Sequence, residues 1–312
     1  MTDIAVAKQA AVDMLLQESR DCDSRMTREN LTFSVSYLSF FGYVATGLLQ
    51  SLADQQLREA ITSFQTWFGL TADGVIGPKT LKAMSLGRCG CNDIPDPDNN
   101  LHLKYMRMQE TIENSKNAWK RNGLTFAIRD HIPGIPPQTQ ADILERAWKA
   151  WDDVCGISIT KAASTDTADL IISTGRGNES KFDGRGGILA WSYLPDGRDK
   201  QLIMKFDLDE IWVTEPPQRG ILLFNVACHE FGHMLGLSHS TRPHSLMAPS
   251  YNPHIAVPQS DDDIEQVRRI YGIDPVASQA KTLSIVCGSG QKFVLTCREL
   301  QIDGFDLVPK KE

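Results

Sequence analysis

The sequence predicts an α+β protein with two folded units, a small helical one followed by a larger one built around a sheet. The chain has 312 residues, about twice the roughly 150 residues of an average domain. A segment rich in Gly, Pro, Asp and Asn, GRCGCNDIPDPDNN (87–100), has the composition of a linker. Beyond it the pattern runs one strand, one helix, four strands and two helices, an order typical of a layered α+β domain.

Residues 31–94 are predicted to form the helical unit. Its second segment repeats apolar residues at helical spacing, namely Leu57, Ile61, Phe64 and Phe68. A Gly-rich turn, ADGVIG, follows and leads into a short helix that starts at Pro78. We expect residues 1–30 to be a helical extension before this unit and residues 95–117 to be the linker after it.

Residues 118–272 are predicted to form the larger unit. LTFAIRD (124–130) alternates like a strand, and TQADILERAWKAWDDV (139–154) has the period of a helix with Thr139 as N-cap. Four further strand candidates are GISITKA, ADLIIST, GILAWSYL and QLIMKFDLD.

Two helices are predicted to close this unit. An apolar helix covers residues 221–235, and a last helix over about 261–271 opens with a Ser260–Asp263 capping pair and stops at Gly272. The tail, residues 273–312, contains a candidate hairpin around CGSGQK.

Composition and charge exclude several classes of protein. A net charge of −7 argues against binding to nucleic acid, which requires a basic face. The longest apolar stretch (31–49) is long enough for a bilayer, but its serines, threonines and glycines favour a helix and turn instead. We therefore expect no membrane span. The N-terminus has no positive leader, so no secretory signal is visible.

The seven cysteines are too few for a disulfide framework, and their number is odd. At least one thiol is therefore free or bound to something else. Cys155 and Cys228 lie in apolar helical patterns and are predicted to be inert core residues. Cys287 and Cys297 could bridge.

The strongest chemical signal is NVACHEFGHMLGLSH (225–239). On a helix His229 and His233 project from one face one turn apart, which suits two bonds to one zinc ion. Glu230 is rotated by about 100° and can reach a water on the metal but cannot easily be a ligand. Gly236 tolerates the left-handed conformation that stops the helix, and His239 then returns to the metal.

Three neutral ligands leave a fourth zinc position open for water, which is the arrangement of a catalytic site. Glu230 can take the proton of that water and later protonate the leaving amine of a peptide. Any one of these histidines alone would be better explained as a core residue with a satisfied hydrogen bond. Burying all three and the glutamate without a metal, however, would cost several kcal/mol of desolvation.

Met247 lies eight residues beyond His239, in SLMAPSY, where a methionine turn completes the metzincin signature. Over residues 35–272 the sequence resembles the matrixins, the matrix metalloproteinase family of zinc endopeptidases. SYLSFFGY resembles the start of the family's prodomain and FQTWFGLTADGVIGPKTLKAM its peptidoglycan-binding-like module. FDGRGGILAWSYLP, KFDLDEIW and DDDIEQVRRIYG follow in family order.

The resemblance implies a twisted, mostly parallel five-stranded sheet with three helices in the larger unit. We expect the hemopexin-like domain common in animal members of the family to be absent.

GRCGCND (87–93) resembles the family's cysteine switch, written P-R-C-G-x-P-D. The resemblance implies that the Cys89 thiolate occupies the fourth zinc position in a latent form, while Arg88 and Asp93 pair to hold the loop. The alternative is an ordinary linker cysteine. Gly87 and Asn92 replace the two prolines of the motif, and Cys91, which lies off the motif, could compete as a ligand.

The family's second, structural zinc is predicted to be missing. Its ligand positions match residues that are unsuited to zinc, namely Arg176, Asn178, Trp191 and Lys205. We expect Arg176 or Lys205 to hold the same loop by a cation–π contact with Trp191.

A calcium site is predicted by the same resemblance. Carboxylates would come from Asp183, Asp207 and Glu210, and backbone carbonyls from Gly184, Gly186 and Ile188. The alternative is an ordinary acidic turn.

The sequence thus predicts a latent zinc metalloendopeptidase with one catalytic zinc and a bound calcium, acting on proteins or peptides. We expect a monomer that is extracellular, the latter by resemblance. In the alternative hypothesis residues 35–86 bind peptidoglycan and bring a peptidase to the cell wall, because DGVIGPKTL also resembles generic peptidoglycan-binding repeats.

Overall fold

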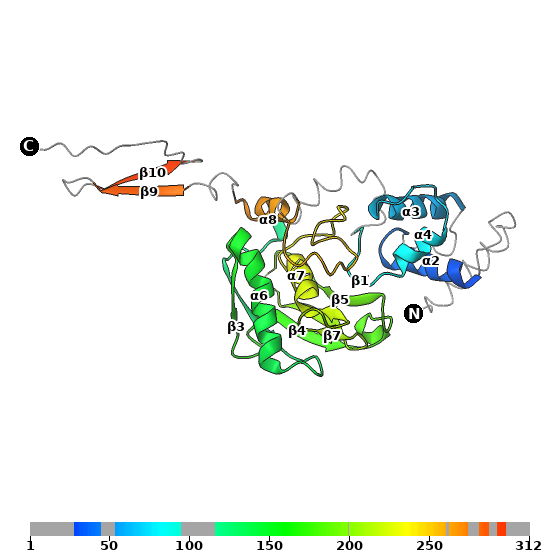
Figure 1. The fold of residues 1–312 in the computed structure, drawn as a ribbon, viewed down its shortest axis with the longest axis horizontal. Coiled ribbons are helices and arrows are strands. Elements are labelled where there is room, and N and C mark those ends of the chain that lie inside the picture. Colours follow the sequence, from blue (N-terminus) through cyan, green and yellow to red (C-terminus); the bar gives the residue numbers. More distant parts are fainter. Residues whose placement is uncertain are drawn as a thin grey trace, which may run out of the picture.

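The structure is a computed structural model that describes residues 28–44, 54–94, 116–198, 200–259, 262–273, 281–286 and 292–297 (Figure 1). The predicted extension (1–30) and linker (95–117) lie mostly outside these residues, as do Ser260, Cys287 and the side chain of Cys297. Within the described residues no helix combines the length and apolar character that crossing a bilayer requires.

The N-terminal unit consists of α2 (Arg28–Phe40), α3 (Asp54–Trp67) and α4 (Pro78–Met84). They enclose an aromatic cluster in which the Phe64 ring lies 5.5 Å from Tyr37 and 5.6 Å from Tyr43 between centroids. The buried Gln65 amide donates to Asp73 Oδ1 at 2.7 Å and accepts from Gly74 N at 2.9 Å. The side chain of one helical residue therefore holds the ADGVIG turn that leads into α4.

The larger unit is built on one mixed sheet. Its strands are β2 (Gly123–Ile128), β3 (Ser158–Lys161), β4 (Leu170–Gly175), β5 (Ile188–Ser192) and β6 (Leu202–Asp207). β5 runs antiparallel to β6, and the other neighbours among these five strands are parallel, which confirms the mostly parallel five-stranded sheet. A sixth strand was not foreseen: β1 (Arg88–Cys89) adds to the edge of β5 in parallel, giving the order β1-β5-β6-β4-β2-β3.

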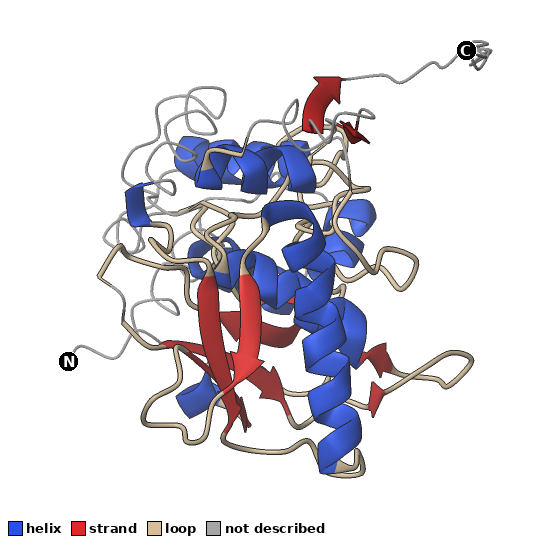
Figure 2. Cartoon of the chain, turned by 90° about the vertical axis from the view of Figure 1, so that its left-hand side faces the viewer, coloured by secondary structure: helices blue, strands red, loops and turns tan. Residues whose placement is uncertain are grey.

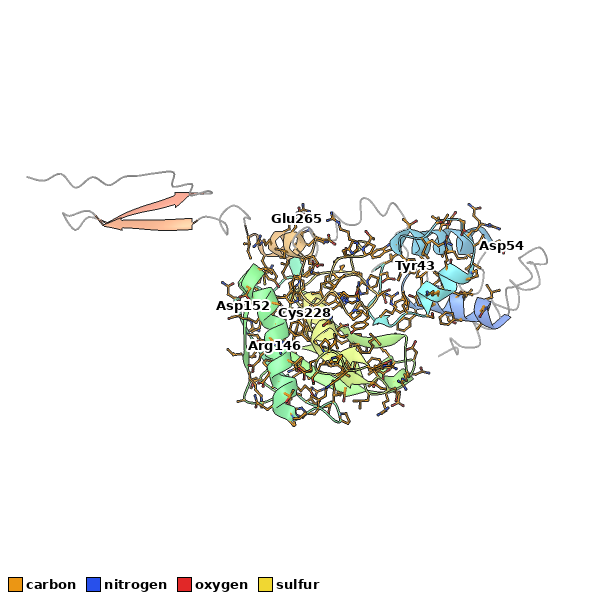
Figure 3. All side chains as sticks on the ribbon, in the orientation of Figure 1. Tyr43, Asp54, Arg146, Asp152, Cys228 and Glu265 are labelled. Atoms are coloured by element: carbon orange, nitrogen blue, oxygen red, sulfur yellow. The ribbon has the colours of Figure 1, made fainter. Side chains whose placement is uncertain are left out.

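Two helices cover one face of this sheet, α6 (Pro137–Cys155) and α7 (Leu223–Met234) (Figure 2). Phe126, Ile172 and Phe206 point from the strands into the core beneath these helices. The thiol of Cys228 on α7 donates to the Ala147 carbonyl of α6 at 3.4 Å (Figure 3). Cys155 and Cys228 are buried and free, as predicted.

The third helix, α8 (Asp263–Tyr271), ends at Gly272 in the left-handed conformation, as predicted. The remaining short elements are η2 (Asn178–Ser180) and the parallel pair β7 (Trp212–Val213) and β8 (Ile221–Leu222). The predicted hairpin in the tail is confirmed as β9 (Lys281–Val286) paired with β10 (Lys292–Cys297).

Three predicted helix starts are wrong. α8 begins at Asp263 with Asp262 as N-cap, so the predicted Ser260–Asp263 capping pair does not open it. α6 begins at Pro137 with Pro136 as N-cap, not with Thr139 capping it, because proline at the first helical position has a suitable φ and no N–H to satisfy. The helix placed over 221–235 starts only at Leu223, because Ile221 and Leu222 pair as β8 with β7.

We expect Gly232→Ala to destabilise the fold by about 1–3 kcal/mol, because overpacking forces neighbours to shift. A Cβ at Gly232 would lie 2.9 Å from Trp151 Cζ2 and closer still to Met247 Sδ. Urea unfolding measures the effect. Gly123→Ala is the matched control, since its Cβ would meet only Ser158 Oγ at 3.9 Å. Equal midpoints for both variants would contradict the packing argument.

Candidate metal centre

Three imidazoles converge at the C-terminal half of α7. His229 and His233 lie one turn apart on the helix, with ring centroids separated by 4.9 Å. His239 reaches the same place after the chain turns back, and its ring lies 4.8 Å from that of His233. Gly236 makes this return possible with a φ of 98°, a conformation that side chains rarely adopt. All three side chains are buried.

Each imidazole is oriented through its Nδ1 atom. His229 Nδ1 lies 2.7 Å from the Leu246 carbonyl, and His233 Nδ1 lies 2.7 Å from the Leu237 carbonyl. His239 Nδ1 lies 2.8 Å from Asp93 Oδ1. Because these partners accept hydrogen bonds, each Nδ1 carries a proton, which leaves Nε2 of the neutral His229 and His239 rings as a lone-pair donor. His229 Nε2 and His239 Nε2 have no hydrogen-bond partner among the described residues.

The Cys89 thiol completes the cluster. Cys89 Sγ lies 3.4 Å from His233 Nε2, and the potential ligand atoms of Cys89, His229, His233 and His239 all lie within 4.8 Å of one another. The sulfur also accepts a hydrogen bond from Cys91 N at 3.3 Å. A set of three imidazole nitrogens and one thiol sulfur gathered this closely fits zinc. A second group of potential metal ligands that lie equally close together consists of Cys89, Cys91, Glu230 and His233.

A buried ion pair holds the segment that carries Cys89. Arg88 donates to Asp93 through Nη2–Oδ1 at 2.5 Å and Nη1–Oδ2 at 3.1 Å, as the resemblance implies. The guanidinium lies 3.4 Å from the centroid of the Phe41 ring, and the Tyr43 hydroxyl donates to Asp93 Oδ2 at 2.7 Å. Burial opposes ionisation of Asp93, but Arg88 and His239 outweigh it and lower its pKa to about 2.

Main-chain hydrogen bonds tie the same segment to both sides of the site. Arg88 N donates to the Gly187 carbonyl at 2.7 Å, and Gly90 N donates to the Ala190 carbonyl of β5 at 2.8 Å. From the other side Cys89 N donates to the Pro249 carbonyl at 2.9 Å. Residues 88–90 therefore cross the histidine cluster as an extended chain.

Glu230 is fully buried beside the cluster. The Ser192 hydroxyl lies 2.7 Å from Glu230 Oε2, while Glu230 Oε1 has no hydrogen-bond partner among the described residues. Burial raises the pKa of this carboxyl to about 8, and the charge of Cys91 acts in the same direction. Burial lowers the pKa values of His229 and His239, so both rings are neutral and suited to metal binding.

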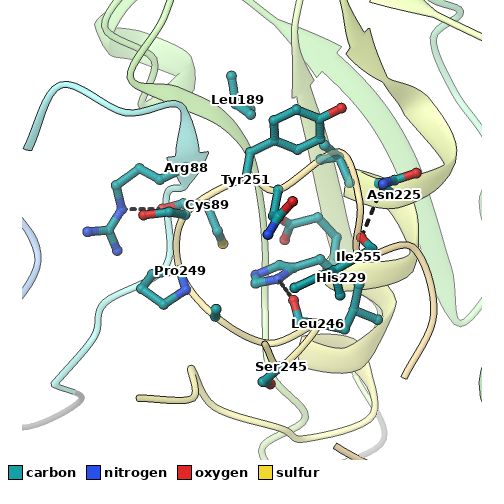
Figure 4. A pocket seen from close by; sticks show the side chains of 15 residues that line it. Arg88, Cys89, Leu189, Asn225, His229, Ser245, Leu246, Pro249, Tyr251 and Ile255 are labelled. Carbon is teal, nitrogen blue, oxygen red and sulfur yellow. Dashed lines mark hydrogen bonds between the residues drawn. The ribbon is translucent and has the colours of Figure 1, made fainter. Parts of the chain in front are cut away.

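A pocket opens beside His229 and Glu230 (Figure 4). Leu189, Tyr251 and Ile255 give it apolar walls. Asn225 also lines it and donates to the Ile255 carbonyl at 3.1 Å. These apolar walls lie next to the histidine cluster.

Met247 lies beneath the cluster, in contact with the helix at Gly232, and is buried. Asp263 at the start of α8 fixes this turn by accepting from Leu246 N at 2.8 Å and Met247 N at 3.1 Å. Since the Leu246 carbonyl orients His229, α8 supports the cluster through the methionine turn.

Lys205 makes the cation–π contact with Trp191 that was expected from Arg176 or Lys205. Lys205 Nζ lies 5.8 Å from the Trp191 ring centroid. Arg176 makes no such contact and forms an ion pair with Asp209, because a carboxylate binds a guanidinium more strongly than a ring face does. Lys181, which the prediction omitted, lies closer to Trp191, at 4.8 Å.

The three predicted calcium carboxylates lie in the loops around β5 and β6. Asp183 Oδ1 accepts from Ile188 N at 2.9 Å, and Glu210 accepts from Gly186 N. Asp207 is buried and its Oδ2 has no partner among the described residues. Burial raises the pKa of Asp207 to about 6, and the charge of Asp183 adds to the effect. Calcium binding here stays a prediction.

Comparison with known proteins places this geometry in a family. The matrixin family model matches residues 118–272, and a model for a peptidoglycan binding domain matches residues 27–84. Metalloendoproteinase 1-MMP of Arabidopsis thaliana is 33% identical over 253 residues, which are 77% of this chain and 68% of that protein. The chain belongs to the matrixin family.

Animal relatives match this matrixin over a smaller share of their own length. The hatching enzyme of Paracentrotus lividus is 34% identical over 78% of this chain and 39% of its own. Interstitial collagenase of Equus caballus is 34% identical over 75% of this chain and 48% of its own. The chain thus spans less than half the length of these two relatives.

Two contacts in this matrixin site were missed from the sequence. Ser192 and Glu230 are 38 residues apart, and Tyr43 and Asp93 are 50 apart. Neither pair forms a local spacing pattern, so only the packing of β5 on α7 and of the turn after α2 on residues 88–93 (the switch segment) reveals them. The polar serine inside the otherwise apolar strand GILAWS was the one available signal.

We expect calcium to raise the melting temperature of this matrixin more at about pH 7.5 than at about pH 5. The pKa of Asp207 in the fold, about 6, exceeds its ordinary value of 3.8. Ionisation of Asp207 therefore destabilises the fold progressively as the pH rises from 3.8 through about 6. A bound cation relieves that loss of stability. Calorimetry with calcium or with chelator measures the difference, and Asp207→Asn should abolish it. An equal calcium effect at both pH values would contradict the assignment.

Proposed function

We propose that this chain is a zinc-dependent endopeptidase made as a latent precursor. The observation that carries the proposal is the convergence of three imidazole Nε2 atoms on one point beside a buried carboxylate. Membership of the matrixin family supports the same conclusion.

His229, His233 and His239 would hold the zinc ion, each with its Nδ1 proton anchored as described. When bound, zinc supplies Lewis acidity toward water and a peptide carbonyl. The surrounding apolar residues exclude bulk water, so that charge in the site is poorly screened.

Glu230 is the proposed general base. Its free Oε1 atom can accept a proton from the attacking water, and the same carboxyl can then donate that proton to the leaving amine. The raised pKa of Glu230 suits an acid and base that must exchange a proton near neutral pH.

The edge of β5 is the proposed docking strand for a substrate. In the latent chain residues 88–90 occupy that edge through main-chain hydrogen bonds. They run across the histidine cluster, and the chain extends from it in both directions. A substrate that replaces them would add as a strand. Because such a strand extends in both directions from the cluster, the bond cleaved is an internal one.

Latency is proposed to come from the Cys89 thiolate at the fourth zinc position. The Arg88–Asp93 pair and the contact of Arg88 with Phe41 hold the thiol there. Removal of residues 1–94 would open the position. We propose in addition a calcium ion at Asp183, Asp207 and Glu210, no structural zinc at the Trp191 loop, a monomer and an extracellular site of action.

We expect Glu230→Gln to lower kcat on a protein such as casein by about 100- to 10,000-fold, because it removes the general base. Zinc content should stay unchanged, since the carboxylate that this substitution replaces is not a ligand. Glu145→Gln on the exposed face of α6 is the control. Wild-type activity, or loss of zinc, in the Glu230 variant would refute this role.

We expect full-length Cys89→Ser to cleave casein without processing, whereas the full-length wild type should require removal of residues 1–94. A hydroxyl is a poorer zinc ligand than a thiolate and would give way to water. Cys91→Ser is the matched control and should stay latent. If both variants are as inactive as the wild type while holding zinc, Cys89 is not the latch.

The match of residues 27–84 to a peptidoglycan binding domain favours a second candidate function, delivery of the peptidase to cell walls. Cosedimentation of the full-length chain with purified peptidoglycan tests it. We expect no binding, since the unit is engaged with the metal site through Arg88 and Asp93. Saturable binding would establish the wall-targeting alternative.

A further inference from the structure

Ser192 is the last residue of β5, and its side chain is buried against α7. Its hydroxyl lies 2.7 Å from Glu230 Oε2 and 2.9 Å from the Glu230 backbone carbonyl. β5 is pinned in this position by its antiparallel pairing with β6, in which Ser192 faces Met204. The Ser192 hydroxyl is therefore held beside the Glu230 carboxyl by a strand and not by a loop.

We propose that Ser192 is a positioning residue that holds the Glu230 carboxyl in place for proton transfer. This inference rests on the proposed function, in which Glu230 is the general base. It concerns how the carboxyl is held, which neither the family comparison nor the motif addresses.

The two oxygens of Glu230 are in different surroundings. Oε2 receives the Ser192 hydroxyl, whereas Oε1 is buried without a partner among the described residues. A carboxylate oxygen of Glu230 also lies within 4.8 Å of Cys89 Sγ and His233. Anchoring one oxygen therefore fixes the direction of the other, which stays free to accept a proton.

The hydroxyl can serve both protonation states of Glu230. It has one proton to donate and lone pairs to accept with. When Glu230 is ionised, the hydroxyl donates to Oε2. When Glu230 holds the proton taken from water on Oε1, Oε2 becomes the carbonyl oxygen of the acid and still accepts the Ser192 hydroxyl proton. The carboxyl keeps a partner in the same place before and after each transfer.

Loss of this contact would leave a long, buried carboxyl without its anchor. Glu has several rotamers, and a displacement of about 1 Å of a catalytic group lowers rates by on the order of 100-fold. Substrate binding along the β5 edge would be unaffected, because Ser192 uses its hydroxyl and not its main chain for this contact.

The first test compares zinc-loaded, activated Ser192→Ala and Ser192→Thr with the wild type on a peptide substrate. We expect Ser192→Ala to lower kcat by about 10- to 100-fold with KM and zinc content unchanged, and Ser192→Thr to restore most of kcat because it keeps the hydroxyl. Ser173→Ala is the control, since this serine is equally buried on β4 but donates to Asp130.

The second test does not depend on activity. Urea unfolding of the zinc-loaded full chain is compared for Ser192→Ala, Glu230→Ala and the double variant. If the two side chains are in direct contact, the change in the equilibrium constant for unfolding in the double variant should differ from the product of the two single changes by roughly 5-fold or more. Multiplicative effects would overturn the proposal.

The remaining outcomes are also decisive. Wild-type kcat in Ser192→Ala, equal loss in the alanine and threonine variants, or a change confined to KM or zinc content would each overturn it. A wild-type chain that holds zinc but cleaves nothing would refute the proposed function instead, and the unfolding comparison would then decide the Ser192–Glu230 contact alone.

Discussion

The site depends on one constraint: three buried imidazoles bring their Nε2 atoms into the same small volume. Each ring is locked by a hydrogen bond from its Nδ1, to Leu246, Leu237 or Asp93. Neutral rings with their lone pairs facing one another repel, and nothing among the described residues donates to His229 Nε2 or His239 Nε2. A cation bound between the rings would remove this repulsion. The helix, the Gly236 turn and the methionine turn could then all be arranged around the bound ion.

Much of this centre could be predicted because its residues are close in sequence. The spacing of His229 and His233, the stop at Gly236 and the return at His239 follow from helix geometry alone. The pairing of Arg88 with Asp93 followed from a short motif. The partners of Glu230 and His239 could not be predicted, since Ser192 and Asp93 reach them only through the register of β5 and the docking of the switch segment.

The errors have equally local causes. Threonine is a common N-cap residue, but the helix starts before Thr139 because Pro137 has a φ suited to the first helical position and no N–H to satisfy. Of the two cations expected over Trp191, Lys205 makes the contact, whereas Arg176 pairs with Asp209. Lys181, which was not expected there, lies closer to the ring. Charge pairing across loops requires the fold to be known.

The hydrogen bond between His239 and Asp93 is one of the contacts that join the two units, and it involves a candidate metal ligand directly. Zinc bound as proposed would fix the His239 ring and so favour the docked segment, and the docked segment, by holding the ring, would favour zinc. By reciprocity the two equilibria share one coupling free energy, so each partner raises the affinity of the other by the same factor. The inhibitory segment would therefore also act as a metal-loading aid, and its departure would loosen the very ion that it had helped to seat.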